Sequence, residues 1–171
     1  MTNNDVLRRI RYTFDFSEHK MVSIFALADT EVTQVQVTQW LKKDDDPDYQ
    51  NCGDKMLTSF LNGLIVEKRG KKEGEQPKPE QRINNNIIFM KLKIALSLKA
   101  DDVLEIMSLA ELNISKHELS AFFRRPDHKH FRECKDQILR NFLKGVQIKY
   151  RDSLESKSAP QPATPSLYKS K

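Results

Sequence analysis

The sequence predicts an all-α fold built from two tandem copies of a unit of roughly four helices. Three observations point to it. The 171-residue chain repeats itself with an offset of 82 residues. Its apolar residues recur at helical spacing and do not alternate as in a strand. Finally, the chain has only five glycines, and long stretches contain none.

The repeat aligns residues 4–69 with residues 86–151 without a gap. QNCGDKMLTSFLNG at 50–63 returns as RECKDQILRNFLKG at 132–145. Matched apolar character in one register over the whole length indicates an internal duplication. Identical pairs recur along the 66 aligned positions and include Asn4/Asn86, Ile24/Ile106, Leu27/Leu109, Ala28/Ala110, Cys52/Cys134, Asp54/Asp136, Leu57/Leu139, Phe60/Phe142, Leu61/Leu143, Gly63/Gly145 and Arg69/Arg151.

The first half of each copy predicts two helices. In the first copy, the stripe formed by Val6, Leu7, Ile10 and Phe14 predicts one helix, with Asn3 or Asn4 as its N-cap. Ser17 is the expected N-cap of the second helix. The apolar residues of that helix have the spacing of one buried face: Met21, Ile24, Phe25 and Ala28.

The second half of each copy predicts two further helices. A capping box begins the third helix, Thr33-x-x-Gln36 in one copy and Ser115-x-x-Glu118 in the other. Asp54 and Asp136 lie in the first turn of the fourth helix, where a carboxylate suits the helix dipole. Its buried face consists of Leu57, Phe60, Leu61 and Leu64, matched by Leu139, Phe142, Leu143 and Val146.

These elements divide the chain into a first helical repeat at 4–69, a flexible linker at 70–85 and a second helical repeat at 86–151. The tail at 152–171 contains three prolines and few large apolar residues, so we expect it to be disordered. A repeat of 66 residues is close to the lower size limit for independent stability. We therefore expect the copies to pack on each other or across a dimer.

Three stretches carry a resemblance to a known family: FLNGLIVEKRGK, RINNNIIFMKLKIALSLK and PDHKHFREC. The chain resembles the YehS-like family of small bacterial proteins, which are built on a domain of unknown function. The resemblance covers roughly residues 3–149. It implies a cytoplasmic bacterial protein with a duplicated domain, and it supplies neither an activity nor catalytic residues.

The composition excludes some classes of protein. With 31% charged residues and no apolar run of roughly 20 residues, the chain is not expected to cross a membrane. The N-terminal residues lack the apolar core of a secretory signal. Two cysteines provide no disulfide framework, which favours the reducing cytoplasm.

Cys52 and Cys134 are the first candidates for chemistry. Both lie near the start of the fourth helix, where the helix dipole can lower the pKa of a thiol and make it reactive. Without a CxxC pair, a small buried residue at a helix contact is the favoured interpretation.

A metal site is not predicted. An EF-hand loop counted from Asp44 would need Gly and Glu where the sequence has Tyr49 and Lys55. His128 and His130 lie close to Cys134, but the first copy has Asp46, Asp48 and Cys52 at these positions, so the set is not a shared motif. No phosphate-binding, hydrolase or dinucleotide motif is present either. We expect no catalytic residues, no metal and no cofactor.

The second and third helices could form a helix-turn-helix. A short connection follows Ala28, and the third helix is rich in Gln and Thr. The turn glycine typical of this motif is missing, and helix pairs of this kind also build ordinary bundles.

Charge separates the two copies more clearly than any motif. Residues 4–69 carry 9 Lys and Arg against 11 Asp and Glu, a net charge of −2, whereas residues 86–151 carry 13 against 8, a net charge of +5. The difference is largest at one equivalent loop. There the first copy has Asp44, Asp45, Asp46 and Asp48, and the second has Arg124, Arg125, Lys129 and Arg132.

From this asymmetry we expect a non-enzymatic helical interaction or regulatory module that makes its contacts through the charged loops. We expect it to self-associate as a homo-oligomer or to bind another protein. The acidic loop would meet the basic loop of a second chain or of the sister copy. The alternative is a nucleic-acid-binding protein that grips phosphates with the basic second repeat. Charges that simply diverged after duplication would explain the pattern without either role.

Overall fold

The computed structural model describes residues 1–154, and within them it contains eight α-helices and one short π-helix but no strand. The first copy contains α1 Asn3–Phe14, α2 Glu18–Leu27, α3 Gln34–Leu41 and α4 Asp54–Arg69. The second contains α5 Asn85–Ala95, α6 Ala100–Leu109, α7 Lys116–Ala121 and α8 Asp136–Gln147, continued by the π-helix η1 Ile148–Asp152. The predicted all-α fold with a duplicated four-helix unit is confirmed.

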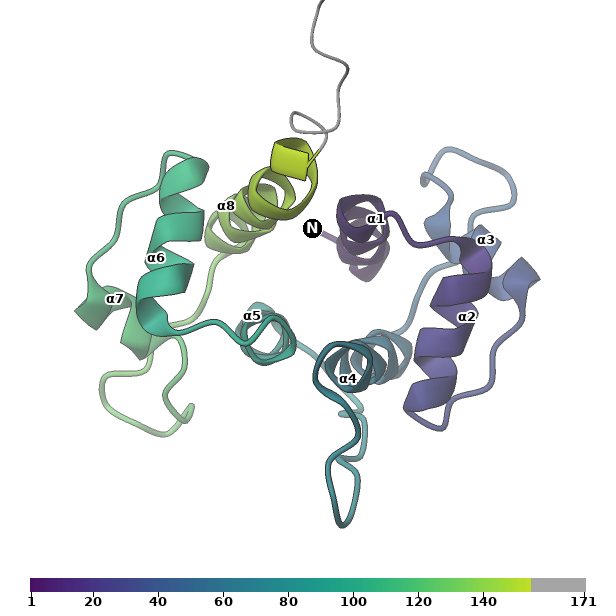
Figure 1. Ribbon diagram of the computed structural model, residues 1–171, viewed down its shortest axis with the longest axis horizontal. Coiled ribbons are helices and arrows are strands. Elements are labelled where there is room, and N and C mark those ends of the chain that lie inside the picture. Colours follow the sequence, from purple (N-terminus) through teal and green to yellow (C-terminus); the bar gives the residue numbers. More distant parts are fainter. Residues whose placement is uncertain (155–171) are drawn as a thin grey trace, which may run out of the picture.

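The two copies pack on each other within one chain. Helices α1, α4, α5 and α8 lie together at the centre, while α2 with α3 and α6 with α7 flank them on opposite sides (Figure 1). Two seams join the copies, one between α4 and α5 and one between α1 and α8. Of the two expected arrangements, packing within the chain is the one that the structure has.

Helix starts follow the capping residues, with one correction. Ser17 caps α2, and the capping boxes of Thr33 and Ser115 form as predicted at α3 and α7. The N-cap of α1 is Thr2, not Asn3 or Asn4, because the Thr2 hydroxyl accepts from the Asp5 amide and the Asp5 carboxylate accepts from the Thr2 amide. This frees both asparagines for contacts farther along the chain.

Each copy has its own aromatic core, assembled from different positions. In the first copy Phe25 packs on Phe60, with ring centroids 5.2 Å apart. In the second copy Phe142, the equivalent of Phe60, instead packs on Phe89, 4.5 Å away. Position 7 is Leu where its equivalent 89 is Phe, and position 25 is Phe where its equivalent 107 is Met. The copies thus exchange one large side chain between two helices, which conserves core volume.

A glycine lets the second and fourth helices of each copy approach closely. A Cβ atom on Gly63 would lie 1.9 Å from the Ile24 carbonyl oxygen, and one on Gly145 would lie 2.1 Å from that of Ile106. No side chain fits at such a distance, so the identity of these two positions follows from packing.

The segment between α4 and α5 has no regular secondary structure, and its second half is fastened to the helices. The Thr58 hydroxyl donates to the Glu80 carbonyl at 3.1 Å, and the Ile83 amide donates to the Asp54 carboxylate at 3.1 Å. Of the tail predicted to be disordered, residues 155–171 lie outside the described residues, while Asp152 ends η1. Within residues 1–154, no helix combines the length and apolarity required to span a membrane.

Candidate interaction loops

The loop between α3 and α4 is held by the buried side chain of Asn4. The Asn4 amide group donates to the Trp40 carbonyl at 2.9 Å and to the Gln50 carbonyl at 2.8 Å. Its oxygen accepts from the Cys52 amide at 3.0 Å. Asn4 is 0% exposed, so one side chain satisfies three backbone groups at both ends of the loop.

Asn86 does the same in the second copy. Its amide group donates to the Phe122 carbonyl at 3.0 Å and to the Arg132 carbonyl at 2.9 Å, and its oxygen accepts from the Cys134 amide at 2.9 Å. The sequence marked these asparagines as an identical pair, but it suggested only a capping role for Asn4. The only indication in the sequence that this asparagine is buried was that it is polar, identical in both copies and next to an apolar helical stripe.

The backbone turns within the two loops also match. In the first copy the Asp46 amide donates to the Lys43 carbonyl at 3.0 Å, and the Gln50 amide donates to the Gln39 carbonyl at 3.2 Å. The equivalent bonds of the second copy run from His128 to Arg125 at 2.9 Å and from Arg132 to Ala121 at 3.1 Å. The two loops therefore share one backbone framework while displaying opposite charges.

Three of the four acidic side chains of the first loop are exposed, namely Asp44, Asp45 and Asp48. Asp46 is half-buried, and its carboxylate accepts from the Asp48 amide at 2.8 Å, so it serves the turn itself. In the second copy His128 takes this role, because its Nδ1 accepts from the His130 amide at 3.0 Å. The acidic surface thus depends on three of the predicted residues.

The basic loop exposes Arg125, Lys129 and Arg132, whereas Arg124 is half-buried. Arg125 forms an ion pair with Asp127 at 3.2 Å, and Arg132 lies 3.9 Å from Glu118. Both pairs are largely exposed, so each contributes little to stability and leaves the arginines available to a partner. The buried Arg124 Nε has no hydrogen-bond partner among the described residues.

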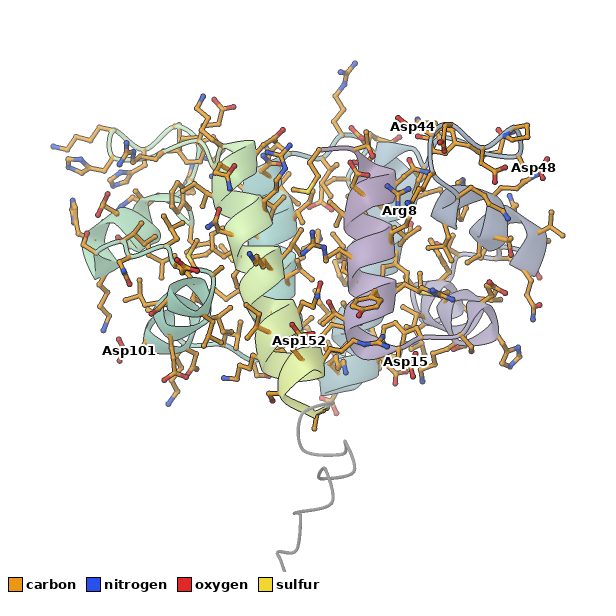
Figure 2. All side chains as sticks on the ribbon, turned by 90° about the horizontal axis from the view of Figure 1, so that it is seen from above. Arg8, Asp15, Asp44, Asp48, Asp101 and Asp152 are labelled. Carbon is orange, nitrogen blue, oxygen red and sulfur yellow. The ribbon has the colours of Figure 1, made fainter. Side chains whose placement is uncertain are left out.

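The two loops do not meet within the chain. Figure 2 shows Asp44 and Asp48 at one corner of the molecule, and the equivalent loop of the second copy lies at the opposite corner of the same edge. The central helices separate them (Figure 1). Contact between the acidic loop and the basic loop of its own sister copy is therefore not formed in this structure.

The two cysteines are free and buried just before the fourth helix of their copies. Burial, and then the nearby Asp54 carboxylate, raise the pKa of the Cys52 thiol to about 12. Burial and Asp136 likewise raise the pKa of Cys134 to about 12. Because the thiolate is the reactive form, both thiols are chemically quiet at neutral pH, which agrees with the packing interpretation.

The histidines approach one another but do not converge with other ligands. The ring centroids of His128 and His130 are 5.5 Å apart, and those of His117 and His130 are 6.5 Å apart. Across residues 1–154, no group of three or more His, Cys, Asp or Glu side chains is placed to hold a metal ion.

The connection between α2 and α3 differs from that of a helix-turn-helix. It covers residues 28–33, six in number, whereas the motif joins its helices by three or four. The equivalent of α3 in the basic copy, α7, contains only six residues. Neither pair offers the long recognition helix that reading a major groove requires.

The comparisons with known proteins agree with the duplication. A family described as protein of unknown function (DUF1456) matches twice, at residues 3–70 and 85–152. The chain is similar to the uncharacterized protein YehS of Escherichia coli (strain K12), with 50% identity over 147 residues that cover 85% of this chain and 94% of the relative. No solved structure matches. The chain therefore belongs to the DUF1456 family of proteins of unknown function and carries two copies of its domain.

Proposed function

We propose that the protein is a non-enzymatic interaction module that self-associates through its two charged loops. The observation that carries this proposal is a pair of loops with matching backbone hydrogen bonds and opposite charge, held at two corners of one edge. The buried Asn4 and Asn86 anchors hold the two charged loops in equivalent positions, which supports a paired contact between them.

The placement of the loops favours one mode of pairing. If two molecules meet at this edge, a two-fold axis perpendicular to the line that joins the two loops brings the acidic loop of each over the basic loop of the other. A two-fold axis along that line would instead oppose like charges. Charge thus selects an isologous pair that closes at two chains and repels the alternative.

The energetics imply a weak, salt-sensitive contact. The side chains concerned are exposed, and exposed ion pairs are worth up to about 1 kcal/mol each. Such charges orient the encounter, and the remaining affinity must come from the surfaces between the loops. Screening over about 8 Å at physiological ionic strength should weaken association as salt is added.

The test is sedimentation velocity over a range of protein and salt concentrations. Wild type should associate at low salt, and Arg124→Glu with Arg125→Glu should abolish association because both corners become acidic. Asp44→Lys with Asp45→Lys should do the same. The combination of all four substitutions restores complementarity and should restore association.

Lys71→Glu with Lys72→Glu is the matched control, because it makes the same charge change in the exposed segment between the copies. Association that is absent in wild type, or that survives in both loop variants, contradicts the proposal. A loss in the control equal to that in the loop variants would point to net charge and not to the loops.

Nucleic-acid binding by the second repeat is the second candidate, and the exposed Arg125, Lys129 and Arg132 favour it. Retention on heparin or DNA should then fall steeply with salt and should be reduced by Arg124→Glu with Arg125→Glu. Unchanged retention in that variant contradicts this candidate. A different protein that carries an acidic segment is the remaining partner class, and capture from cytosol would identify it.

We further propose that no catalysis is involved and that the protein works in the cytoplasm. In support of the first point, the two most nucleophilic side chains, Cys52 and Cys134, are held as protonated thiols. In support of the second, both are free, which suits a reducing compartment.

A further inference from the structure

The two seams that join the copies have opposite character. Helix α4 packs along α5 over more of its length than α1 does along α8. Among the residues that line the α1–α8 seam, Asp5, Arg8, Tyr12 and Gln147 have apolar equivalents in the repeat, Ile87, Met90, Ile94 and Ile65. Arg9 and Arg140 instead have the polar equivalents Lys91 and Thr58.

The α1–α8 seam opens into a cleft of about 310 Å³. Three arginines line it: Arg8 and Arg9 from α1, and Arg140 from α8. Figure 2 looks onto this seam, with α1 and α8 side by side and Arg8 on α1. The volume is at the lower end of the range for small-molecule sites, and it can accommodate a phosphate with part of the group that carries it.

Of these three arginines, Arg8 has a close carboxylate partner, whereas Arg9 and Arg140 do not. Arg8 forms an ion pair with Asp5 and also donates to the Lys42 carbonyl at 2.8 Å, so it is held in place. Arg9 makes one long hydrogen bond, to the Gln147 side chain at 3.4 Å, and has no carboxylate partner among residues 1–154. Its equivalent at the closed seam, Lys91, lies 3.2 Å from Glu80.

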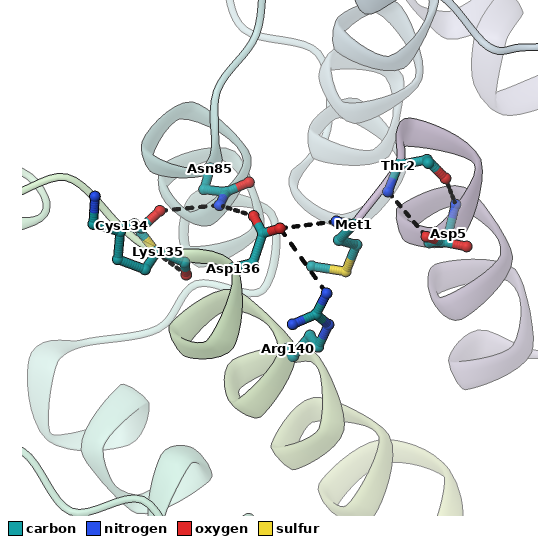
Figure 3. Close-up of polar contacts among 8 residues, drawn as sticks. All are labelled: Met1, Thr2, Asp5, Asn85, Cys134, Lys135, Asp136 and Arg140. Carbon is teal, nitrogen blue, oxygen red and sulfur yellow. Dashed lines mark hydrogen bonds and ion pairs between the residues drawn. The ribbon is translucent and has the colours of Figure 1, made fainter.

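Arg140 has a carboxylate nearby, but other groups occupy that carboxylate. Asp136 accepts from the Met1 amino group at 2.8 Å and from the Asn85 side chain at 2.8 Å, and Arg140 lies 3.9 Å away (Figure 3). Through these bonds Asp136 fixes the rim of the cleft. The Arg140 guanidinium retains donors that can turn towards a ligand.

An aromatic side chain completes the cleft. Tyr12 lines it and is 43% exposed, and the Arg151 guanidinium lies over the Tyr12 ring at 3.9 Å from the centroid. Arginines that flank an exposed aromatic ring are typical of sites for nucleotides, where guanidinium groups bind phosphate and the ring stacks on a base.

We infer that the α1–α8 cleft binds a phosphate-bearing ligand of the nucleotide class. Arg9 and Arg140 contact the phosphate, and Tyr12 offers a stacking surface for the base. Arg8 stays bound to Asp5 and to the Lys42 carbonyl at the edge of the cleft. Because α1 belongs to the first copy and α8 to the second, the ligand bridges the copies and stabilises their packing. The proposed ligand contacts use none of the charged loop side chains, so this inference does not depend on self-association.

The test uses the full chain and three probes: pyrophosphate, ATP and a short fluorescent oligothymidylate. Calorimetry follows the first two, and fluorescence anisotropy follows the third at about 50 and 200 mM salt. Wild type should bind at least one probe, with a rise in unfolding temperature from linkage. Arg9→Gln with Arg140→Gln should weaken binding by at least about ten-fold, since two charge-assisted contacts are lost.

Lys71→Gln with Arg82→Gln is the matched control, because it also removes two positive charges, from exposed side chains between the copies, and it should bind as wild type does. Binding of ATP identifies a free nucleotide as the source of the phosphate, and binding of the oligothymidylate alone identifies a nucleic-acid strand. Either result supports the site. The inference is overturned if no probe binds, if the double variant binds as tightly as wild type, or if the control loses as much affinity. Urea midpoints verify that each variant is folded.

Discussion

The contact at Gly63 gives the sharpest prediction, because helix propensity and packing predict opposite signs for the substitution Gly63→Ala. Gly63 lies inside α4, where alanine is intrinsically favoured over glycine by about 1 kcal/mol. The added Cβ would however lie 1.9 Å from the Ile24 carbonyl oxygen, whereas ordinary contacts begin at 3.4 Å. Both groups are helix backbone, so neither can turn aside.

The size of the effect follows from the separation that is required. Moving α4 from α2 by about 1.5 Å would open gaps around Phe25 and Phe60, which are 0% exposed. A gap of about 0.5–1 Å already forfeits a quarter to a half of the dispersion energy between facing atoms. Overpacking costs roughly 1–3 kcal/mol, and a clash with helix backbone lies at the upper end, so after the gain of about 1 kcal/mol in propensity we expect a net loss of about 2 kcal/mol.

Urea denaturation followed by far-ultraviolet circular dichroism measures this loss. Gly145→Ala in the second copy should behave alike, because its Cβ would lie 2.1 Å from the Ile106 carbonyl oxygen. Gly53→Ala is the control, since a Cβ there meets nothing within 4 Å, and it should cost at most about 1 kcal/mol as a weaker N-cap. A Gly63→Ala protein as stable as wild type, or more stable, would refute the close approach of the helices.

Three further predictions concern buried groups and titration. Asn4→Ala leaves two backbone carbonyls and one backbone amide without their partner, which costs about 1–3 kcal/mol of stability for each group that stays buried. Hydrogen exchange should therefore rise in residues 40–52 and not in residues 122–134. Asn86→Ala should give the reverse pattern. Cys52 and Cys134 should resist a thiol reagent at pH 8 until urea unfolds the protein, and prompt labelling would contradict their burial. Because burial raises their folded pKa from the ordinary 9.0 to about 12, the stability of the folded state should fall as the pH rises from 9 to 12. The hydrogen bond from Asn3, and then that from Ile83, hold the pKa of Asp54 below its ordinary 3.8, so its contribution to stability should fade as pH drops below that value, and Asp54→Asn should lessen the loss seen in acid titration.

Local sequence predicted the helices of this protein well. The capping boxes at Thr33 and Ser115 and the N-cap at Ser17 are short-range patterns, since the hydrogen bonds that they form span about three residues. The N-cap of α1 was predicted wrongly because Thr2, Asn3 and Asn4 are all good capping residues, and only the distant carbonyls of Trp40 and Gln50 draw Asn4 inward. Local propensity cannot distinguish between neighbours whose roles depend on residues 36 and 46 positions away.

The candidate surfaces divide in the same way. The opposite net charges of the two loops could be read from the sequence by comparing the aligned segments 42–50 and 124–132. The partial burial of Asp46 and Arg124 could not be read from the sequence, because it depends on how each loop turns. The cleft between α1 and α8 was missed altogether, although comparison of Arg8 and Tyr12 with their apolar equivalents in the second copy would have indicated it.

The sequence by itself determined the duplication, the helical class and the buried face of each helix, because the spacing of apolar residues shows which face of a helix is buried. It did not determine which partner covers that side. Only the tertiary structure decided that the copies pair within one chain, that the apolar seam between α4 and α5 closes, and that the arginine-lined seam between α1 and α8 stays open. The physical reason is that burial of apolar surface is non-directional, whereas the fit of two particular seams depends on every side chain along them.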